Sequence, residues 1–115
     1  LMSRAKGGIK RTKHRRNLHK LTKGYEAGRK NLVKLAKTAI KKAGAHSYRD
    51  RRIKKRDFRA LWEIQINAGA RLNGTTYSRL IGALKTKKIG INRKALAEIA
   101  GKYPALFTKL VETVK

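Results

Sequence analysis

Positive charge is the property that most limits how this chain can fold. Its 115 residues include 32 Lys and Arg but only six Asp and Glu, which gives a formal net charge of +26. Self-repulsion on this scale opposes the collapse of a compact monomer, and a polyanion relieves it. Nucleic acid, an anionic membrane surface and a very acidic protein are the possible polyanions. The composition therefore predicts a polyanionic partner.

The charge is concentrated in the first half of the chain. Residues 1–59 contain 22 Lys and Arg against three acids, a net charge of +19, whereas residues 60–115 contain ten against three, a net of +7. Large apolar residues are distributed the other way, with 12 before Phe58 and 20 from Phe58 onward. Only the second half has enough apolar surface to offset its chain entropy. We expect a basic extension over residues 1–59 and a small compact domain over residues 60–115.

Helical periodicity nevertheless runs through the basic half. An apolar stripe begins at Tyr25 and continues through Leu32, Ala36, Ala39 and Ala43. A second face, within about 60° by helix geometry, carries Lys30, Lys34, Lys37 and Lys41. Because like charges at this spacing repel one another, we interpret the face as a phosphate-binding surface rather than only a solvated one.

One long helix is expected to join the two halves. It would run from about Glu26 to Asn73, roughly 70 Å at 1.5 Å per residue, so its basic part must project from a small domain. Asn73-Gly74 supplies the stop signal. The segment that joins the halves places six residues on one helical face: Phe58, Leu61, Gln65, Ala68, Gly69 and Leu72.

Short helices are expected after Gly74. Thr76 is a candidate cap for a helix whose inner side carries Tyr77, Leu80, Ile81 and Leu84. Asn92 can cap a helix from Arg93 to Ala100 that ends at Gly101. Pro104 suits the first position of a last helix, whose inner face carries Phe107, Leu110, Val111 and Val114. The sequence contains no alternating strand pattern longer than a few residues. The predicted fold class is therefore all-α: a long basic N-terminal helical extension followed by a small compact helical domain.

Catalytic chemistry is not visible in this sequence. His14, His19 and His46 lie among cations without cysteine or paired carboxylates, so RNA contact or solvent exposure is a better interpretation than a metal site. Gly7-Gly8 and the pair Gly24 and Gly28 lack the features of a phosphate-binding loop and indicate turns or close backbone approaches. We predict no enzyme, no metal, no cofactor and no small-molecule substrate.

Four aromatic residues have separate interpretations. Trp62 and Tyr77 are expected in the core, while for Tyr25, at the expected helix start, and Tyr48 packing and RNA contact are equally good interpretations. The chain has no aromatic ladder of the kind that grips single strands. Recognition is therefore expected to rest on the phosphates and shape of structured RNA.

Two other binding classes are weaker interpretations of the same charge. A nucleoid-type architectural DNA-binding protein is the alternative, but such proteins usually insert apolar wedges or wrap DNA as dimers, and no wedge-bearing arm is evident. A membrane-active helix needs a strong apolar face, whereas the stripe here is mostly alanine. No run approaches the roughly 18 apolar residues of a membrane span.

Short motifs along nearly the whole chain resemble one known family, the bacterial large-subunit ribosomal protein L-twenty family. The resemblance covers essentially all residues from Met2 onward. The motifs are Arg4-Ala5-Lys6-Gly7-Gly8, Lys23-Gly24-Tyr25, Tyr48-Arg49-Asp50-Arg51-Arg52, Lys55-Arg56-Asp57-Phe58-Arg59, Leu61-Trp62, Ile66-Asn67-Ala68-Gly69-Ala70-Arg71, Asn73-Gly74, Tyr77-Ser78, Asn92-Arg93-Lys94 and Leu96-Ala97. So many short matches in order are far more specific than any one of them.

The resemblance implies a structural role in the large ribosomal subunit. Members of the family thread a basic helical tail into large-subunit rRNA, organise that RNA early in assembly and do no catalysis. By carry-over, the rRNA-binding residues of the extension are Lys6, Lys10, Arg11, Lys13, Arg15, Arg16, Lys20, Lys23, Arg29, Tyr48, Arg49, Arg51, Arg52, Lys54, Lys55, Arg56 and Arg59. In the domain, Asn67, Arg71, Asn73 and Ser78 match positions near the RNA-facing surface.

The resemblance also implies partners and a location. The expected partners are large-subunit rRNA and neighbouring large-subunit ribosomal proteins, and some members of the family repress their own messenger RNA. The basic N-terminus superficially resembles an organelle transit peptide. Because the basic character continues through about half the chain and cysteine is absent, we interpret it as mature sequence and expect a cytoplasmic rather than an organellar ribosome.

Three positions depart from the family pattern. Glu63 and Gln65 stand where the family usually has an apolar and a basic residue, so the RNA contact of this stretch is in question. We expect Glu63 to pair with Arg59, one helical turn earlier. Tyr103 precedes Pro104 where an acidic cap is common, which predicts a weaker helix start.

Overall fold

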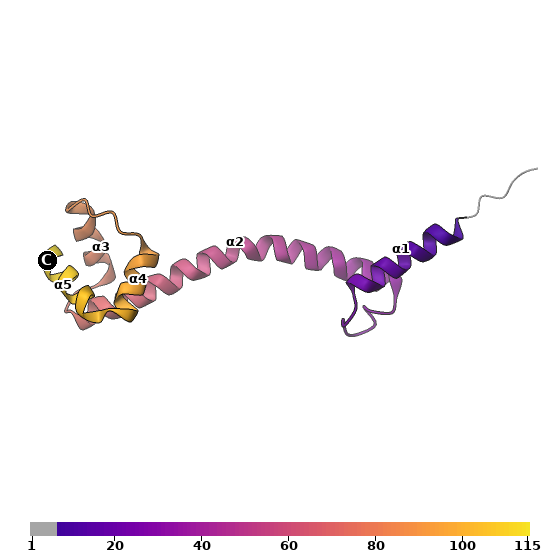
Figure 1. Cartoon of the computed structure of the whole chain (residues 1–115), viewed down its shortest axis with the longest axis horizontal. Helices are drawn as coiled ribbons and strands as arrows, with labels where there is room; N and C mark the ends of the chain where they lie inside the picture. The colour runs from indigo at the N-terminus through magenta and orange to yellow at the C-terminus, as the bar shows by residue number, and fades with distance from the viewer. Residues whose placement is uncertain (1–6) are drawn as a thin grey trace, which may run out of the picture. The chain divides into compact units, whose positions relative to one another are not determined.

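The computed structural model describes residues 7–115, and all its regular elements are α-helices (Figure 1). They are α1 (Gly8–Leu21), α2 (Val33–Leu72), α3 (Tyr77–Thr86), α4 (Arg93–Lys102) and α5 (Pro104–Val114). The predicted fold class, all-α with a long basic helical part followed along the chain by a small helical domain, is confirmed. None of the helices in this range combines the length and apolar character that a membrane span requires.

The backbone divides into two compact units between Arg51 and Arg52, within α2. We name them the basic unit, which ends at Arg51, and the C-terminal unit, Arg52–Lys115. The boundary between residues 59 and 60 that composition indicates stays a prediction.

The basic unit has a very small buried centre. Leu18 of α1 and Ala36 of α2 are buried, together with Thr22 in the connection between the helices. The Thr22 hydroxyl donates to the Leu18 carbonyl over 3.3 Å, which satisfies its polar group one helical turn back. So little apolar burial gives these helices weak tertiary support, because packing supplies most helix stability in proteins.

The long helix begins later than the sequence predicts. The structure starts α2 at Val33 rather than near Glu26, and Tyr25 and Lys30 lie in the preceding loop. Gly24 and Gly28 have φ values of 90° and 75°, and these left-handed conformations break a right-handed helix. The expectation that the two glycines mark turns is confirmed, whereas Gly8 begins α1 instead of a turn.

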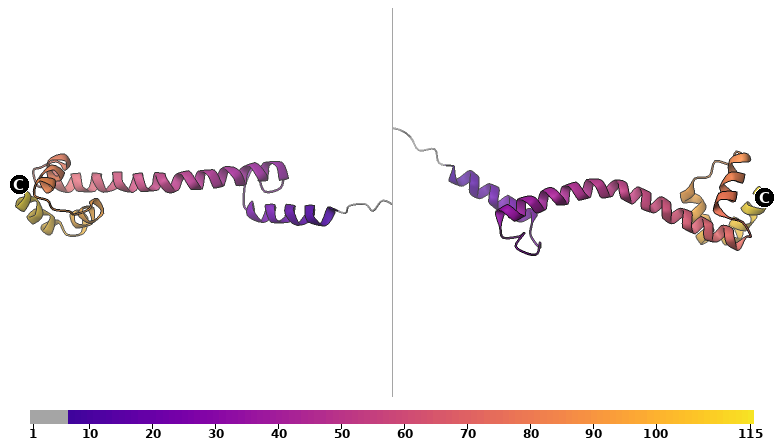
Figure 2. Two further views of the ribbon diagram at one scale, coloured as in Figure 1. Left: turned by 90° about the horizontal axis from the view of Figure 1, so that it is seen from above. Right: turned by 180° about the vertical axis from the view of Figure 1, so that it is seen from behind.

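The C-terminal unit is built around one apolar core. Figures 1 and 2 show α3, α4 and α5 gathered around the C-terminal end of α2. The buried residues of this core are Ile66, Ala70, Leu80, Leu84, Leu96, Ala97, Phe107, Val111 and Val114. Trp62, Tyr77, Ile81 and Leu110 are partly buried against it, so the predicted inner faces of α3 and α5 and the core position of Trp62 are confirmed.

The face of α2 that enters this core differs from the predicted one. Ile66 and Ala70 are fully buried, whereas Phe58 and Leu61 are each 45% exposed and Leu72 is 89% exposed. Apolar residues occur on both faces of this segment, so helical spacing alone fits either choice. A Cβ added at Gly69 would lie 3.0 Å from Phe107 Cε1, so Gly69 is the member of the predicted face that does approach α5.

The helix starts of the C-terminal unit use different groups. Asn92 caps α4, because its side chain accepts a hydrogen bond from the Ala95 backbone N–H over 2.8 Å, as predicted. Pro104 is the first residue of α5, also as predicted, and Tyr103 supplies no side-chain cap. Thr76 occupies the N-cap position of α3 but makes no capping hydrogen bond, so its predicted role as the cap is wrong. Helix α4 continues through Gly101 to Lys102.

Candidate nucleic-acid interface

Helix α1 exposes all of its positive side chains. Its six Lys and Arg, every one of them predicted to bind rRNA, are Lys10, Arg11, Lys13, Arg15, Arg16 and Lys20. The first turn of α1 contains no acid, and Leu18 is its only buried residue. No strong apolar period marks this helix in the sequence, so its bounds could not be predicted. Lys6, the remaining predicted residue of this stretch, lies outside the described residues.

The loop between α1 and α2 carries the next two predicted residues, Lys23 and Arg29, and both are exposed. His19 Nδ1 lies 2.8 Å from the carbonyl oxygen of Lys30, so the ring N–H donates to that carbonyl and ties the end of α1 to the loop. Within the loop, the Tyr25 backbone N–H donates to the Thr22 carbonyl over 3.0 Å. These bonds hold the loop in one conformation.

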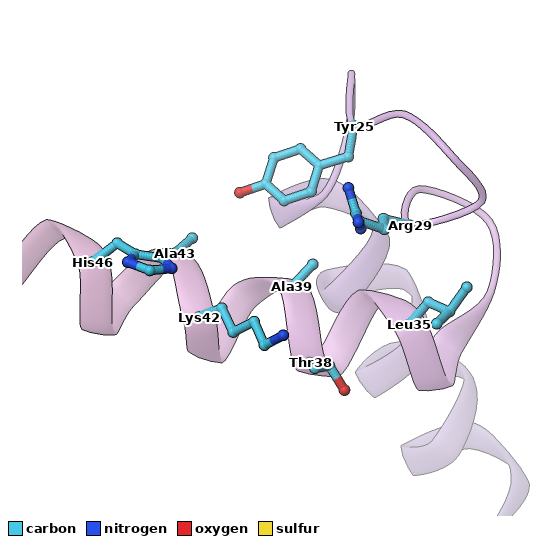
Figure 3. A pocket seen from close by; sticks show the side chains of 8 residues that line it. All are labelled: Tyr25, Arg29, Leu35, Thr38, Ala39, Lys42, Ala43 and His46. Carbon is cyan, nitrogen blue, oxygen red and sulfur yellow. The ribbon is translucent and has the colours of Figure 1, made fainter.

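The loop and α2 line an open groove of about 450 Å³ within the basic unit (Figure 3). Its lining residues are Tyr25, Arg29, Leu35, Thr38, Ala39, Lys42, Ala43 and His46. Of these, only Arg29 was among the predicted binding residues. The sequence shows two pairs of residues four positions apart, Ala39 with Ala43 and Lys42 with His46. It does not show that the loop covers them.

The central part of α2 carries eight further predicted residues, and the structure exposes all of them: Tyr48, Arg49, Arg51, Arg52, Lys54, Lys55, Arg56 and Arg59. Arg49 Nε lies 3.1 Å from Asp50 Oδ1, and the side chains of both residues are more than half exposed. The Arg51 guanidinium lies 5.8 Å from the centre of the Tyr48 ring, a cation–π distance. Exposed pairs of this kind contribute little to stability, so the cations stay available to an anionic ligand.

The four predicted residues of the C-terminal unit fall into two groups. Arg71 and Ser78 are exposed. Asn67 and Asn73 are partly buried and make hydrogen bonds within the protein. Asn67 Oδ1 accepts from the Tyr77 backbone N–H over 3.2 Å, and Asn73 Nδ2 donates to the Gly69 carbonyl over 2.8 Å. The two amides thus support the connection between α2 and α3.

Glu63 lies between two arginines. Its Oε1 is 3.5 Å from Arg59 Nε, as predicted, and also 3.5 Å from Arg93 Nε. Arg93 Nε in turn donates to the Tyr77 hydroxyl over 2.8 Å. Glu63 therefore neutralises part of the charge of two cations and links α2 to α4. Sequence spacing predicted the first pair only, because Arg93 is thirty positions away along the chain.

No group of three or more His, Cys, Asp or Glu side chains within residues 7–115 is arranged to hold a metal ion. His14 and His46 are exposed, and His19 is partly buried through its contact with the loop. The arrangement that the described residues offer is instead a dense display of cations, with one aromatic groove beside it.

Comparisons with known proteins agree with this picture. A family model described as Ribosomal protein L20 matches residues 4–110. The chain is 50% identical, over 113 residues and 98% of each chain, to the large ribosomal subunit protein bL20 of Chlorobium phaeovibrioides (strain DSM 265 / 1930). It is 49% identical, over the same lengths, to the proteins of the same name from Chlorobium limicola (strain DSM 245 / NBRC 103803 / 6330) and Pelodictyon phaeoclathratiforme (strain DSM 5477 / BU-1). The resemblance seen in the motifs is confirmed, and with it the expectation of a family of ribosomal proteins rather than enzymes. The chain belongs to the ribosomal protein L20 family.

Proposed function

We propose that this protein is a structural constituent of the large ribosomal subunit that binds large-subunit rRNA directly and organises it early in subunit assembly. The names of the relatives support the ribosomal part of this proposal. One observation of the structure carries the RNA-binding part. All fifteen Lys and Arg within residues 7–51 are exposed, and Glu26 and Asp50 are the only acids in that range.

The placement of the cations suits phosphates that approach from several directions. In the C-terminal unit, Arg52, Arg56 and Arg59 share one face of α2, within about 60° by helix geometry, while Lys54 projects from the opposite side. Each phosphate contact releases condensed counterions, which makes binding favourable and salt-dependent. The weak apolar support of the basic unit indicates that RNA supplies much of the stabilisation of its helices.

The predicted binding residues remain part of this proposal, with one distinction. The exposed cations of α1, the loop and α2, together with Arg71 and Ser78, are accessible to RNA. Asn67 and Asn73 are proposed to act indirectly, since they hold the connection that leads to Ser78 at the start of α3. The further partners are neighbouring large-subunit proteins and the protein's own messenger RNA, and the location is the cytoplasmic ribosome.

Competition binding tests the proposal. Wild-type protein is titrated onto bacterial large-subunit rRNA transcribed in vitro, against duplex DNA at matched salt. With about eight phosphate contacts, the log–log salt slope is expected near −7. Equal affinity for DNA would favour the architectural DNA-binding alternative, which no comparison supports. A slope shallower than about −3 would show that most of the predicted cations do not contact RNA.

A pair of double variants locates the contacts. Arg52→Ala with Arg56→Ala should make the slope shallower by about 2, because two phosphate contacts are lost. Lys85→Ala with Lys109→Ala removes the same charge from α3 and α5 and should change the slope much less. Retention of the wild-type protein on large subunits through high-salt washing, and early appearance in assembly intermediates, test the assembly role.

A further inference from the structure

The groove beside Tyr25 has a construction that the general display of cations does not explain. We propose that it binds one unstacked nucleotide of the rRNA, with the base against the Tyr25 ring and the phosphate beside Arg29 and Lys42. This inference rests on the proposed rRNA binding and assigns a specific role to two residues outside the predicted site, Tyr25 and Lys42.

Local contacts shape the backbone at Tyr25. Its backbone N–H is bonded to Thr22, whose side chain is fully buried. Ala27 has a φ of 56°, a left-handed conformation that is unfavourable for a residue with a Cβ. Such conformations persist where the surroundings hold them, and they concentrate at binding sites. A ring held in this way loses little conformational freedom when a base stacks on it.

The opposite wall of the groove leaves room for a flat ligand. Ala39 and Ala43, one turn apart on α2, present only methyl groups on the side of the helix that Tyr25 overhangs (Figure 3). The Tyr25 side chain is partly buried, so part of its ring stays accessible. Tyr48, by contrast, is 57% exposed and does not line this groove.

The charges of the lining select an anionic ligand. Arg29, Lys42 and His46 line the groove, and no carboxylate does. Glu26, the acid of the same loop, is exposed and lies outside the lining. A nucleotide matches this combination of an aromatic wall, a small apolar wall and flanking cations, because it joins a flat base to a phosphate. Unpaired bases of structured RNA are recognised by stacking on aromatic side chains.

Variants of the full-length chain separate stacking from charge. Tyr25→Leu keeps apolar bulk but removes the aromatic face, so rRNA affinity should fall roughly fivefold to a hundredfold, with an unchanged salt slope. Tyr25→Phe retains the ring and should stay within about twofold of wild type. Lys42→Ala should make the slope shallower by about 1. Tyr103, 59% exposed and outside the predicted binding residues, offers the matched aromatic control, and Tyr103→Leu should leave the affinity near the wild-type value.

A second pair of variants fills the groove without touching Tyr25. Ala43→Met should weaken binding, because the longer side chain occupies the space of the base, whereas Ala45→Met, at an exposed position of α2 outside the lining, should not. Chemical probing of the rRNA should show one nucleotide whose base is protected by wild type and by Tyr25→Phe but not by Tyr25→Leu or Ala43→Met. Circular dichroism with excess rRNA confirms that each variant reaches the wild-type helix content.

The outcomes distinguish this inference from the proposed function. If wild-type protein fails to bind rRNA, the proposed function fails and the groove assignment with it. If wild type binds with a steep salt slope but Tyr25→Leu and Ala43→Met bind equally well, only the groove assignment is overturned. Normal rRNA affinity of both variants with reduced incorporation into large subunits would mean that the groove receives a neighbouring protein, which also overturns it.

Discussion

Asn67 of α2 accepts a hydrogen bond from the backbone N–H of Tyr77, the first residue of α3, over 3.2 Å between Oδ1 and N. An amide ten positions away in the sequence thus performs the capping function that Thr76, next to the helix, does not. The unpaired N–H groups at a helix start need such an acceptor. The bond fixes the start of α3 to α2 and makes Asn67 a residue of the fold as well as a candidate RNA neighbour.

Asn67→Ala should therefore destabilise the protein by about 1 kcal/mol, the usual effect of losing a capping side chain. Thr76→Ala is the control and should change stability by less than about 0.5 kcal/mol, since its hydroxyl makes no capping bond. Urea denaturation of the full chain, followed by the fluorescence of Trp62, measures both. A larger effect for Thr76→Ala than for Asn67→Ala would contradict this assignment.

Gly69→Ala tests the contact between α2 and α5. The added Cβ would lie 3.0 Å from Phe107 Cε1 and 3.2 Å from Ala100 Cβ. Overpacking opposes the better helix propensity of alanine, so the variant should be less stable than wild type by about 1 kcal/mol. Gly82→Ala on α3 adds the same methyl group to open space and should stabilise by about 0.5–1 kcal/mol. Equal stabilisation by both changes, in thermal denaturation, would refute the close approach.

Glu63→Gln should release Arg59 and Arg93 from their shared carboxylate, both at 3.5 Å. Because the pairs are partly exposed, stability should change by less than about 1 kcal/mol. The affinity for rRNA should rise and the salt slope should become steeper, since the arginines become free for phosphate. Glu112→Gln removes the same charge from α5 and should leave the slope near the wild-type value. Weaker rRNA binding by Glu63→Gln would show that the carboxylate is needed to position these arginines.

Gln65→Arg restores the basic residue that the family usually has at this position. Gln65 is exposed on α2, so the new side chain is free to reach phosphate. The rRNA affinity should rise, and one added contact should steepen the salt slope by about 1. Salt titrations of the variant beside wild type measure this. A loss of affinity would mean that the amide makes a contact of its own that arginine cannot replace.

Acidification tests the pair formed by Glu98 and Lys102 on α4. The hydrogen bond from Lys102 over 2.6 Å, together with its charge, lowers the pKa of Glu98, and the charge of Lys94 adds a smaller effect. A carboxyl whose pKa is depressed on folding stabilises the protein above its unfolded pKa, and this contribution disappears as the pH falls through the folded pKa. Glu98→Gln should therefore be slightly less stable than wild type near about pH 7, and the difference should shrink as the pH falls below the ordinary pKa of a glutamate, about 4.3. Lys102→Gln should remove the same part of the pH dependence, and a stability difference that grows on acidification would contradict the assignment.

Much of the C-terminal unit could be predicted from local sequence signals. Asn92 and Pro104 each mark a helix start by short-range chemistry, a capping side chain in one case and a fixed φ in the other. The apolar spacing of Leu80 with Leu84, and of Phe107 with Val111, identifies buried faces because it is the only strong apolar pattern on those helices. The interpretation of Thr76 as a cap failed because its side chain makes no capping hydrogen bond, while the distant Asn67 amide accepts from the first N–H of the helix.

Two long-range relationships could not be predicted in this way. Ile66 and Ala70 of α2 join Phe107 of α5 in the core, whereas Phe58 and Leu61 stay exposed. Which side of α2 is buried depends on the later helices that pack against it. The groove beside Tyr25 depends on left-handed turns that bring the loop over Ala39 and Ala43. In both cases the residues that meet are separated along the chain, and no periodicity reports on them.

The sequence by itself determined the family, the helical fold class and the basic character of the first half, because charge, helix signals and ordered motifs are properties of neighbouring residues. The tertiary structure alone decided that Asn67 caps α3, that Glu63 joins Arg59 to Arg93, and that Tyr25 overhangs a groove. Each of these is a contact between segments that only the folded backbone brings within bonding distance, where hydrogen bonds, ion pairs and packing act over a few ångströms.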